Sequence, residues 1–214
     1  MSVVRVVPAL LTSDRNELER MVDIANDFAP FVQVDIMDGR FVDSTSISAD
    51  DLAECSIGFK WEAHLMVADP LNYLRAFLGV GATRVIFHIE SDDDPGDVIA
   101  RARSLGIGIG VAINPDTPVS AVDAVLPLVD SLLIMSVYPG YYGAAFVPEV
   151  LDKALAVRRV YPDLELGIDG GIKEGNLVNV ARAGFDTICV GSAIFRAPDP
   201  AASYRRLSQL ASTA

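Results

Sequence analysis

The run Phe31-Val32-Gln33-Val34-Asp35 is short and largely apolar, and it ends in a carboxylate. Strands of a parallel sheet are buried on both faces, so they read as continuous apolar runs of this kind. Four further runs also end in a polar residue or a glycine-containing turn: Trp61-Glu62-Ala63-His64, Val85-Ile86-Phe87-His88, Leu166-Gly167-Ile168-Asp169-Gly170-Gly171 and Thr187-Ile188-Cys189-Val190-Gly191-Ser192. Polar groups at the carboxyl ends of parallel strands mark the active-site face of an α/β enzyme. We therefore expect these groups to meet at one mouth.

The rest of the chain repeats this alternation of strand and helix. The expected strands are Val3–Leu10, Phe31–Asp35, Lys60–Met66, Arg84–His88, Gly108–Ile113, Ser131–Met135, Leu164–Asp169 and Thr187–Val190. The expected helices are Asp14–Asp27 (N-cap Thr12 or Ser13), Ala49–Ala53, Pro70–Leu78, Pro95–Leu105, Val119–Leu126, Pro148–Tyr161, Asn176–Ala183 and Pro200–Leu210. Eight alternations favour a closed barrel over an open doubly wound sheet. At about 27 residues per unit (214/8), the sequence predicts an α/β protein with a single (β/α)8 TIM barrel domain over residues 1–214.

Composition limits the classes of partner. The net charge of −12 argues against nucleic acid, because a phosphate backbone needs a basic surface. A small phosphorylated substrate remains compatible, since backbone N–H groups bind phosphate locally. Cys55 and Cys189 are the only cysteines, which indicates a reducing cytoplasm rather than a disulfide framework. The N-terminus lacks a signal-peptide pattern and no apolar run has the length of a membrane span, so we expect no membrane partner.

Two aspartates are the candidate acid/base groups. Asp35 ends the second expected strand and Asp169 ends the seventh, so they face the mouth of an eight-stranded barrel from different sides. Inverting a carbon centre needs this arrangement, because one group removes a proton and the other returns one from the opposite face. His64 ends the neighbouring third strand and completes a candidate divalent-metal site for Zn, Mn, Fe or Mg. Taken singly, each of these residues is equally explained as a helix cap or a satisfied polar core group.

Glycine turns are the candidate phosphate site. Gly170-Gly171 and Gly191-Ser192 follow the seventh and eighth strands, where barrels of this class frequently bind phosphate. The long segment Tyr138–Phe146 has two glycines flanking two tyrosines, which is typical of a hinged lid. A rigid surface turn is the alternative, but long loops on this barrel face tend to be functional.

Other residues at the expected mouth have a functional and a structural interpretation. His88 either binds substrate or pairs with Glu90 at a turn, and we favour the second. Met37, Met66 and Met135 fall at or just past strand ends. Methionine usually fills gaps in a core. Three of them at one rim nevertheless suggest a soft apolar wall around the reacting atoms.

Five segments resemble the ribulose-phosphate 3-epimerase family: Val34–Val42, Ala63–Val67, Met135–Gly140, Ile168–Ile172 and Val190–Phe195. They keep the family's order, and the likeness runs nearly end to end. The resemblance implies a barrel that interconverts D-ribulose 5-phosphate and D-xylulose 5-phosphate through a metal-stabilised enediolate. It implies that Asp35 and Asp169 are the acid/base pair, and that both bind a divalent metal with His64. It also implies a phosphate site made of Gly140, Tyr141, Tyr142, Gly143, Gly170, Gly171, Gly191 and Ser192.

Three positions depart from the family's usual pattern. Ala9 stands where a serine is usual. The family's Gly-Phe-Gly-Gly-Gln loop here reads Gly140-Tyr141-Tyr142-Gly143-Ala144. Gln33 stands where a histidine usually ligates the metal. Because an amide oxygen is a weaker ligand than imidazole, we expect Gln33 to complete a metal site that binds weakly.

Two other functions remain open at this point. One is epimerisation of a related ketose phosphate such as a hexulose 6-phosphate. Aldol and decarboxylase relatives share an Asp-x-Lys-x-x-Asp pattern, and the segment Asp35-Ile36-Met37-Asp38 has no lysine, which counts against them. The other is a sugar-phosphate-binding protein with lost activity, which Ala9 and Gln33 favour and the intact aspartates oppose. In each case we expect a small sugar phosphate as partner and a homo-oligomer.

Overall fold

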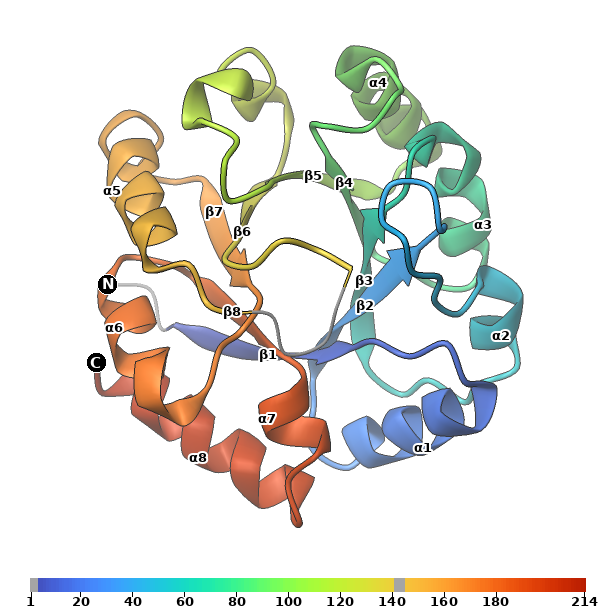
Figure 1. Cartoon of the computed structure of the whole chain (residues 1–214). Helices are drawn as coiled ribbons and strands as arrows, with labels where there is room; N and C mark the ends of the chain where they lie inside the picture. Colours follow the sequence, from blue (N-terminus) through green and yellow to red (C-terminus); the bar gives the residue numbers. More distant parts are fainter. Residues whose placement is uncertain (1–3, 141–144) are drawn as a thin grey trace.

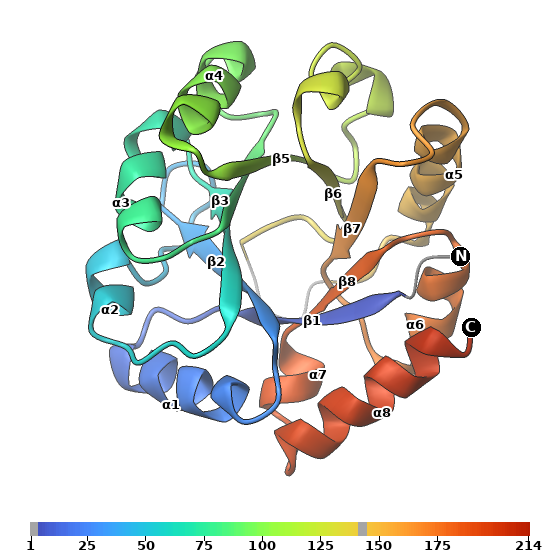
Figure 2. The same cartoon turned by 180° about the vertical axis from the view of Figure 1, so that it is seen from behind.

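The computed structural model describes residues 4–140 and 145–214, and these form a closed barrel of eight parallel strands (Figure 1). The strands are β1 (Arg5–Leu10), β2 (Phe31–Met37), β3 (Lys60–Met66), β4 (Arg84–His88), β5 (Gly108–Ile113), β6 (Ser131–Met135), β7 (Glu165–Asp169) and β8 (Thr187–Val190). Each strand pairs with the next, and β8 pairs with β1 to close the ring. The helices surround the strands in both views (Figures 1 and 2). The predicted (β/α)8 TIM barrel is therefore confirmed, while the expected domain extent of 1–214 goes beyond the described residues.

The helices follow the predicted order with local differences. They are α1 (Arg15–Asn26), α2 (Ala49–Ala53), α3 (Leu74–Gly79), α4 (Pro95–Leu105), α5 (Leu151–Val160), α6 (Glu174–Arg182), α7 (Ser192–Phe195) and α8 (Pro200–Ser212). Short 3₁₀ turns occur at η1 (Pro70–Asn72), η2 (Val119–Ala121), η3 (Leu126–Leu128) and η4 (Pro148–Val150). The α-helix expected over Val119–Leu126 is wrong. Two separate 3₁₀ turns form there, and Pro127, directly after the expected helix, disfavours the α conformation of the residue before it.

Side-chain caps explain where several helices begin. Asp14 caps α1 by accepting a hydrogen bond from the backbone N–H of Glu17 at 2.8 Å, so the expected cap at Thr12 or Ser13 is wrong. Ser48 and Asp51 cap α2 reciprocally. Such caps satisfy N–H groups that have no partner within the helix.

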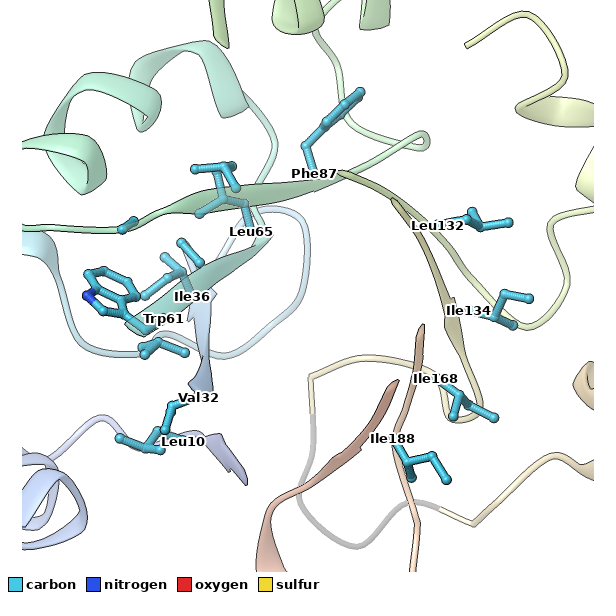
Figure 3. Packing of buried hydrophobic residues seen from close by; sticks show 14 of the residues in the cluster. Leu10, Val32, Ile36, Trp61, Leu65, Phe87, Leu132, Ile134, Ile168 and Ile188 are labelled. Carbon is cyan, nitrogen blue, oxygen red and sulfur yellow. The ribbon is translucent and has the colours of Figure 1, made fainter. Parts of the chain in front are cut away.

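Alternation along the strands separates two buried layers. Odd and even residues of a strand point to opposite faces. Outward residues such as Val32 and Ile36 of β2 pack in the layer between strands and helices, which Figure 3 shows from close by. A second apolar cluster, which includes Ala9, Met135 and Cys189, packs separately from that layer. On β2 the residues that alternate with the outward ones are Gln33 and Asp35, and this places them inside the barrel.

Candidate active site

The two aspartates lie at the same end of the barrel. Asp35 is near the end of β2 and Asp169 is the last residue of β7, and parallel strands bring their carboxyl ends to one face. Both residues are buried, with 6% and 8% exposed, and both line one cavity. The structure therefore brings together the two carboxylates that the sequence predicted to converge.

His64 joins the carboxylates from the neighbouring strand. It is level with Asp35 in the β2–β3 register, and its Nδ1 lies 2.8 Å from Asp35 Oδ1 and 3.5 Å from Asp169 Oδ2. One ligand atom from each of these three residues lies within 4.8 Å of the others. Two carboxylates and an imidazole are a donor set that suits divalent metals. The triad Asp35–His64–Asp169 therefore fits a divalent metal, as the sequence predicted.

Gln33 lies beside the triad in an orientation that the sequence did not predict. Its amide nitrogen donates hydrogen bonds to Asp35 Oδ1 and to Asp169 Oδ2, each at 2.8 Å. Its amide oxygen accepts a hydrogen bond from the thiol of Cys189 at 3.0 Å. Oxygen is the only ligating atom of an amide, and here it faces away from the triad. The role of Gln33 as a ligand stays a prediction.

A second histidine fixes the ring of His64 from behind. Glu90 accepts hydrogen bonds from the backbone N–H of Asn114 at 2.8 Å and from Nδ1 of His88 at 3.1 Å. Burial opposes ionisation of Glu90, but these bonds lower its pKa to about 2, so it stays an acceptor. With Nδ1 of His88 donating, Nε2 of His88 accepts from Nε2 of His64 at 3.0 Å. This series of hydrogen bonds leaves Nδ1 of His64 directed at the carboxylates. The predicted pairing of His88 with Glu90 is confirmed.

Buried charge shifts the proton affinities in the site. Burial, and then the charge of Asp35, raises the pKa of Asp169 from 3.8 to about 7. Burial disfavours the charged ring of His64, but the hydrogen bond and charge of Asp35 outweigh it and raise the pKa of His64. Burial also lowers the pKa of His88 to about 4. Asp169 therefore keeps a proton at pH values where an ordinary carboxyl group has lost it, which suits a general acid.

We expect this proton to affect stability with a defined sign. Because folding raises the pKa of Asp169, its contribution is complete below about pH 4 and is lost as pH rises through about 7. His88 opposes this trend between about pH 4 and 6.5, since folding lowers its pKa. The quantity to measure is therefore the difference between wild type and Asp169→Asn in urea unfolding with a chelator present. The advantage of wild type should fall from pH 4 to pH 7 by at most about 1.4 kcal/mol per unit, and a constant difference would contradict the shifted pKa.

The predicted glycine turns line the same cavity. Gly170 and Gly171 have φ angles of +111° and +64°, a backbone conformation that favours glycine. A Cβ on Gly170 would also overlap Val137. The cavity lining includes Gly140, Gly170, Gly171, Gly191 and Ser192. Tyr141, Tyr142 and Gly143, in the middle of the predicted lid, lie outside the described residues.

Other lining residues modify the sequence prediction. Met66 and Met135 line the cavity, whereas Met37 lines a neighbouring one with Ser44 and Thr45. The sequence reasoning missed Lys173, which is the only basic residue among the described residues that line the cavity. Its position two residues after the Gly170-Gly171 turn was the available signal.

A closed parallel barrel with two buried carboxylates facing one cavity at the carboxyl ends of its strands defines an acid/base enzyme of the (β/α)8 class. The chain belongs to the ribulose-phosphate 3-epimerase family, whose model matches residues 5–195. This membership places it among the epimerases, which are isomerase-class enzymes. The resemblance predicted from the sequence is thereby confirmed.

Curated relatives and solved structures agree with this assignment. The ribulose-phosphate 3-epimerase of Mycobacterium tuberculosis (strain CDC 1551 / Oshkosh) is 35% identical over 98% of this chain and 93% of its own length. A cytoplasmic isoform from Oryza sativa subsp. japonica is 35% identical, over 92% and 89%. The structure of 3-hexulose-6-phosphate synthase from Salmonella typhimurium matches with a TM-score of 0.74 and 18% identity, covering 97% of this chain and 98% of that one. That likeness shows the fold alone. In the described part of the chain, no helix has the length and apolar character to cross a bilayer.

Proposed function

We propose that this enzyme interconverts D-ribulose 5-phosphate and D-xylulose 5-phosphate by inverting C3. The observation that carries the proposal is the pair of buried carboxylates, Asp35 and Asp169, which enter one cavity from strands β2 and β7. Curated relatives over nearly the whole chain bear the name of this activity. A proton at C3 is acidic because it lies beside the C2 ketone.

The two carboxylates perform the inversion in two proton transfers. One carboxylate removes the C3 proton, and the C–H electron pair moves toward C2 as the ketone oxygen becomes the anionic oxygen of an enediolate. The other carboxyl group then donates its proton to C3 from the opposite face. Asp169 is suited to start one direction as the acid, since burial and Asp35 raise its pKa to about 7. After inversion each carboxyl group is in the state needed for the reverse reaction.

A divalent metal held by Asp35, His64 and Asp169 would supply Lewis-acid stabilisation of the negative charge that develops on the substrate oxygens. The side chains around the triad hold it in place. His88 keeps Nδ1 of His64 directed at the carboxylates. His64 and Gln33 are fully buried, and neither is among the residues that line the cavity.

The direct test is proton–deuterium exchange at C3 of candidate ketose phosphates in D2O, followed by NMR. We expect rapid exchange with D-ribulose 5-phosphate, together with appearance of D-xylulose 5-phosphate. Exchange confined to a hexulose 6-phosphate would replace the proposed substrate with that related ketose phosphate. Binding of the phosphates without exchange at C3 would indicate a sugar-phosphate-binding homologue and would overturn the proposed activity.

The phosphate group is proposed to bind at the turns that follow β7 and β8. Replacing Gly191 with valine places a branched side chain where the backbone must approach the anion, so Gly191→Val should raise KM for D-ribulose 5-phosphate by about tenfold or more. Gly175→Val is the matched control, because a Cβ on Gly175 meets open space on α6. Steady-state kinetics and thermal melting of both variants separate binding from folding. An unchanged KM in folded Gly191→Val would place the phosphate elsewhere.

The proposal also covers the location and the assembly state of the enzyme. We place the enzyme in the cytoplasm, which the naming of the Oryza sativa relative supports. We also expect a homo-oligomer. Light scattering of the purified protein tests this.

A further inference from the structure

Gln33 makes an unusual set of contacts for a neutral side chain. It is fully buried on β2, and its amide nitrogen bonds carboxylates from two strands, Asp35 on β2 and Asp169 on β7, at 2.8 Å each. The same nitrogen lies 3.5 Å from Nδ1 of His64. It therefore contacts all three atoms that would bind the metal.

Charge explains why the nitrogen rather than the oxygen faces the carboxylates. In the reverse orientation the amide oxygen would lie 2.8 Å from an oxygen of Asp35 and an oxygen of Asp169, and a proton on Asp169 could separate only one of these two pairs. On the other side the thiol of Cys189 donates to the amide oxygen at 3.0 Å. Burial, and then the charge of Asp169, raises the pKa of the Cys189 thiol well above 9.0, so it keeps the proton that it donates. Both sides favour the same orientation.

We propose that Gln33 is a positioning residue that substitutes for the metal: its two N–H groups hold Asp35 and Asp169 together in the metal-free protein, and a divalent metal must displace them to bind. An amide nitrogen carries two protons, whereas an imidazole nitrogen carries at most one. A histidine at this position cannot bridge both carboxylates from a single nitrogen. The amide therefore gives this chain a carboxylate pair that stays assembled without metal.

The two roles open to Gln33 predict opposite effects on metal binding. If Gln33 were a ligand, removing its amide would weaken metal binding. As a substitute for the metal, its removal strengthens metal binding, because the metal no longer has to break the two hydrogen bonds from the amide to Asp35 and Asp169. Each such bond is strong in a buried site. The sign of the change in metal affinity therefore distinguishes the two roles.

The experiment is a calorimetric titration of Gln33→Met with Mn²⁺ and Zn²⁺ in the absence of sugar. Methionine has a similar length and no hydrogen-bonding amide. We expect the metal Kd to fall by about tenfold or more relative to wild type. In a chelator the Tm of Gln33→Met should be several degrees below that of wild type, and metal should restore it. Gln209→Met, on the exposed side of α8, makes the same chemical change away from the site and should leave both quantities unchanged.

Weaker metal binding by Gln33→Met would overturn the proposal and make Gln33 a ligand. If Gln33→Met does not fold, Cys189 provides a second route that leaves Gln33 and the triad intact. Cys189→Ala removes the group that fixes the amide and should tighten metal binding by about two- to fivefold, whereas Cys189→Ser donates more strongly and should weaken it. Shifts in the same direction, or no shift, would refute the proposal.

This inference rests on the proposed function only for the catalytic role of the two carboxylates. The titrations contain no sugar, so they give the same result whether or not the enzyme acts on D-ribulose 5-phosphate. If the metal Kd changes as predicted but the protein does not catalyse exchange at C3 of the sugar, the role of Gln33 is upheld and the proposed function is refuted. Rapid exchange in a protein without those changes in Kd would do the reverse.

Discussion

Asp35→Asn and Asp169→Asn each lower the rate of C3 inversion by about 10²- to 10⁴-fold, the usual contribution of a positioned acid or base. An amide neither accepts the C3 proton nor returns one, so either substitution interrupts the reaction in both directions. Interconversion of D-ribulose 5-phosphate and D-xylulose 5-phosphate, followed by NMR, measures the loss. The change is nearly isosteric, and both side chains are buried at the cavity wall, so the barrel should remain folded.

Proton–deuterium exchange at C3 in D2O can also distinguish the roles of the two carboxylates. Each epimer presents its C3 proton to a different carboxylate. A variant should therefore lose all exchange with the epimer whose C3 proton points at the substituted residue. Any residual exchange, without inversion, should occur with the other epimer. Asp35→Asn and Asp169→Asn should show opposite epimer preferences. Asp152→Asn, on the exposed side of α5, is the matched control and should match wild type. Near-normal inversion by a folded Asp35→Asn or Asp169→Asn variant would rule out the two-base mechanism.

The parts of the site that were predictable come from strand ends. Asp35, His64 and Asp169 each terminate or nearly terminate an apolar run, and parallel topology alone brings such residues to one face. The strands themselves were predictable because a run buried on both faces needs no periodicity to be recognised. Helix α7 was not, since four residues are too few to show a helical pattern.

The missed features depend on contacts between distant segments. Gln33 and Asp169 are 136 positions apart, and Gln33 and Cys189 are 156 apart. In a strand that is apolar on both faces, the sequence does not show which residues point inward, so the direction of the Gln33 amide could not be inferred. The same ambiguity hid Glu62, which looked like an interruption of an apolar run. In the structure it binds Arg84 at the end of the barrel opposite the cavity.

That ion pair is part of a buried network at the N-terminal end of the barrel strands, which we call the floor of the barrel. Arg84 begins β4, and its guanidinium donates to Glu62 of β3 at 2.6 Å and to Glu165 of β7 at 2.7 Å. The side chains of Arg84 and Glu62 are 15% and 4% exposed. Burial opposes the charge of Arg84, but the two carboxylates outweigh it and raise its pKa, so the guanidinium stays charged. One cation thus connects strands on different sides of the ring.

Removing this cation is expected to destabilise the barrel strongly, although Arg84 lies far from the active site. Arg84→Met leaves Glu62 buried without its counter-ion, and breaking a buried pair in this way costs about 3–5 kcal/mol of unfolding free energy. Arg103→Met, which removes an exposed pair with Asp130, should cost about 1 kcal/mol or less. Urea unfolding at neutral pH measures both. A cost for Arg84→Met no larger than that for Arg103→Met would show that the floor pair does not stabilise the barrel.

A double variant identifies the uncompensated carboxylate as the cause. If the loss in Arg84→Met arises from the buried charge of Glu62, the additional change Glu62→Met should recover most of it, because a well-packed apolar pair can replace a buried ion pair at little cost. Lowering the pH should rescue the single variant in the same way. Burial raises the pKa of Glu62 even beside Arg84, so the isolated carboxyl group should take up a proton readily and lose its charge. The stability of Arg84→Met relative to wild type should therefore rise from pH 7 to pH 5. A double variant as unstable as Arg84→Met, with no rescue at pH 5, would instead assign the loss to the packing of the arginine side chain.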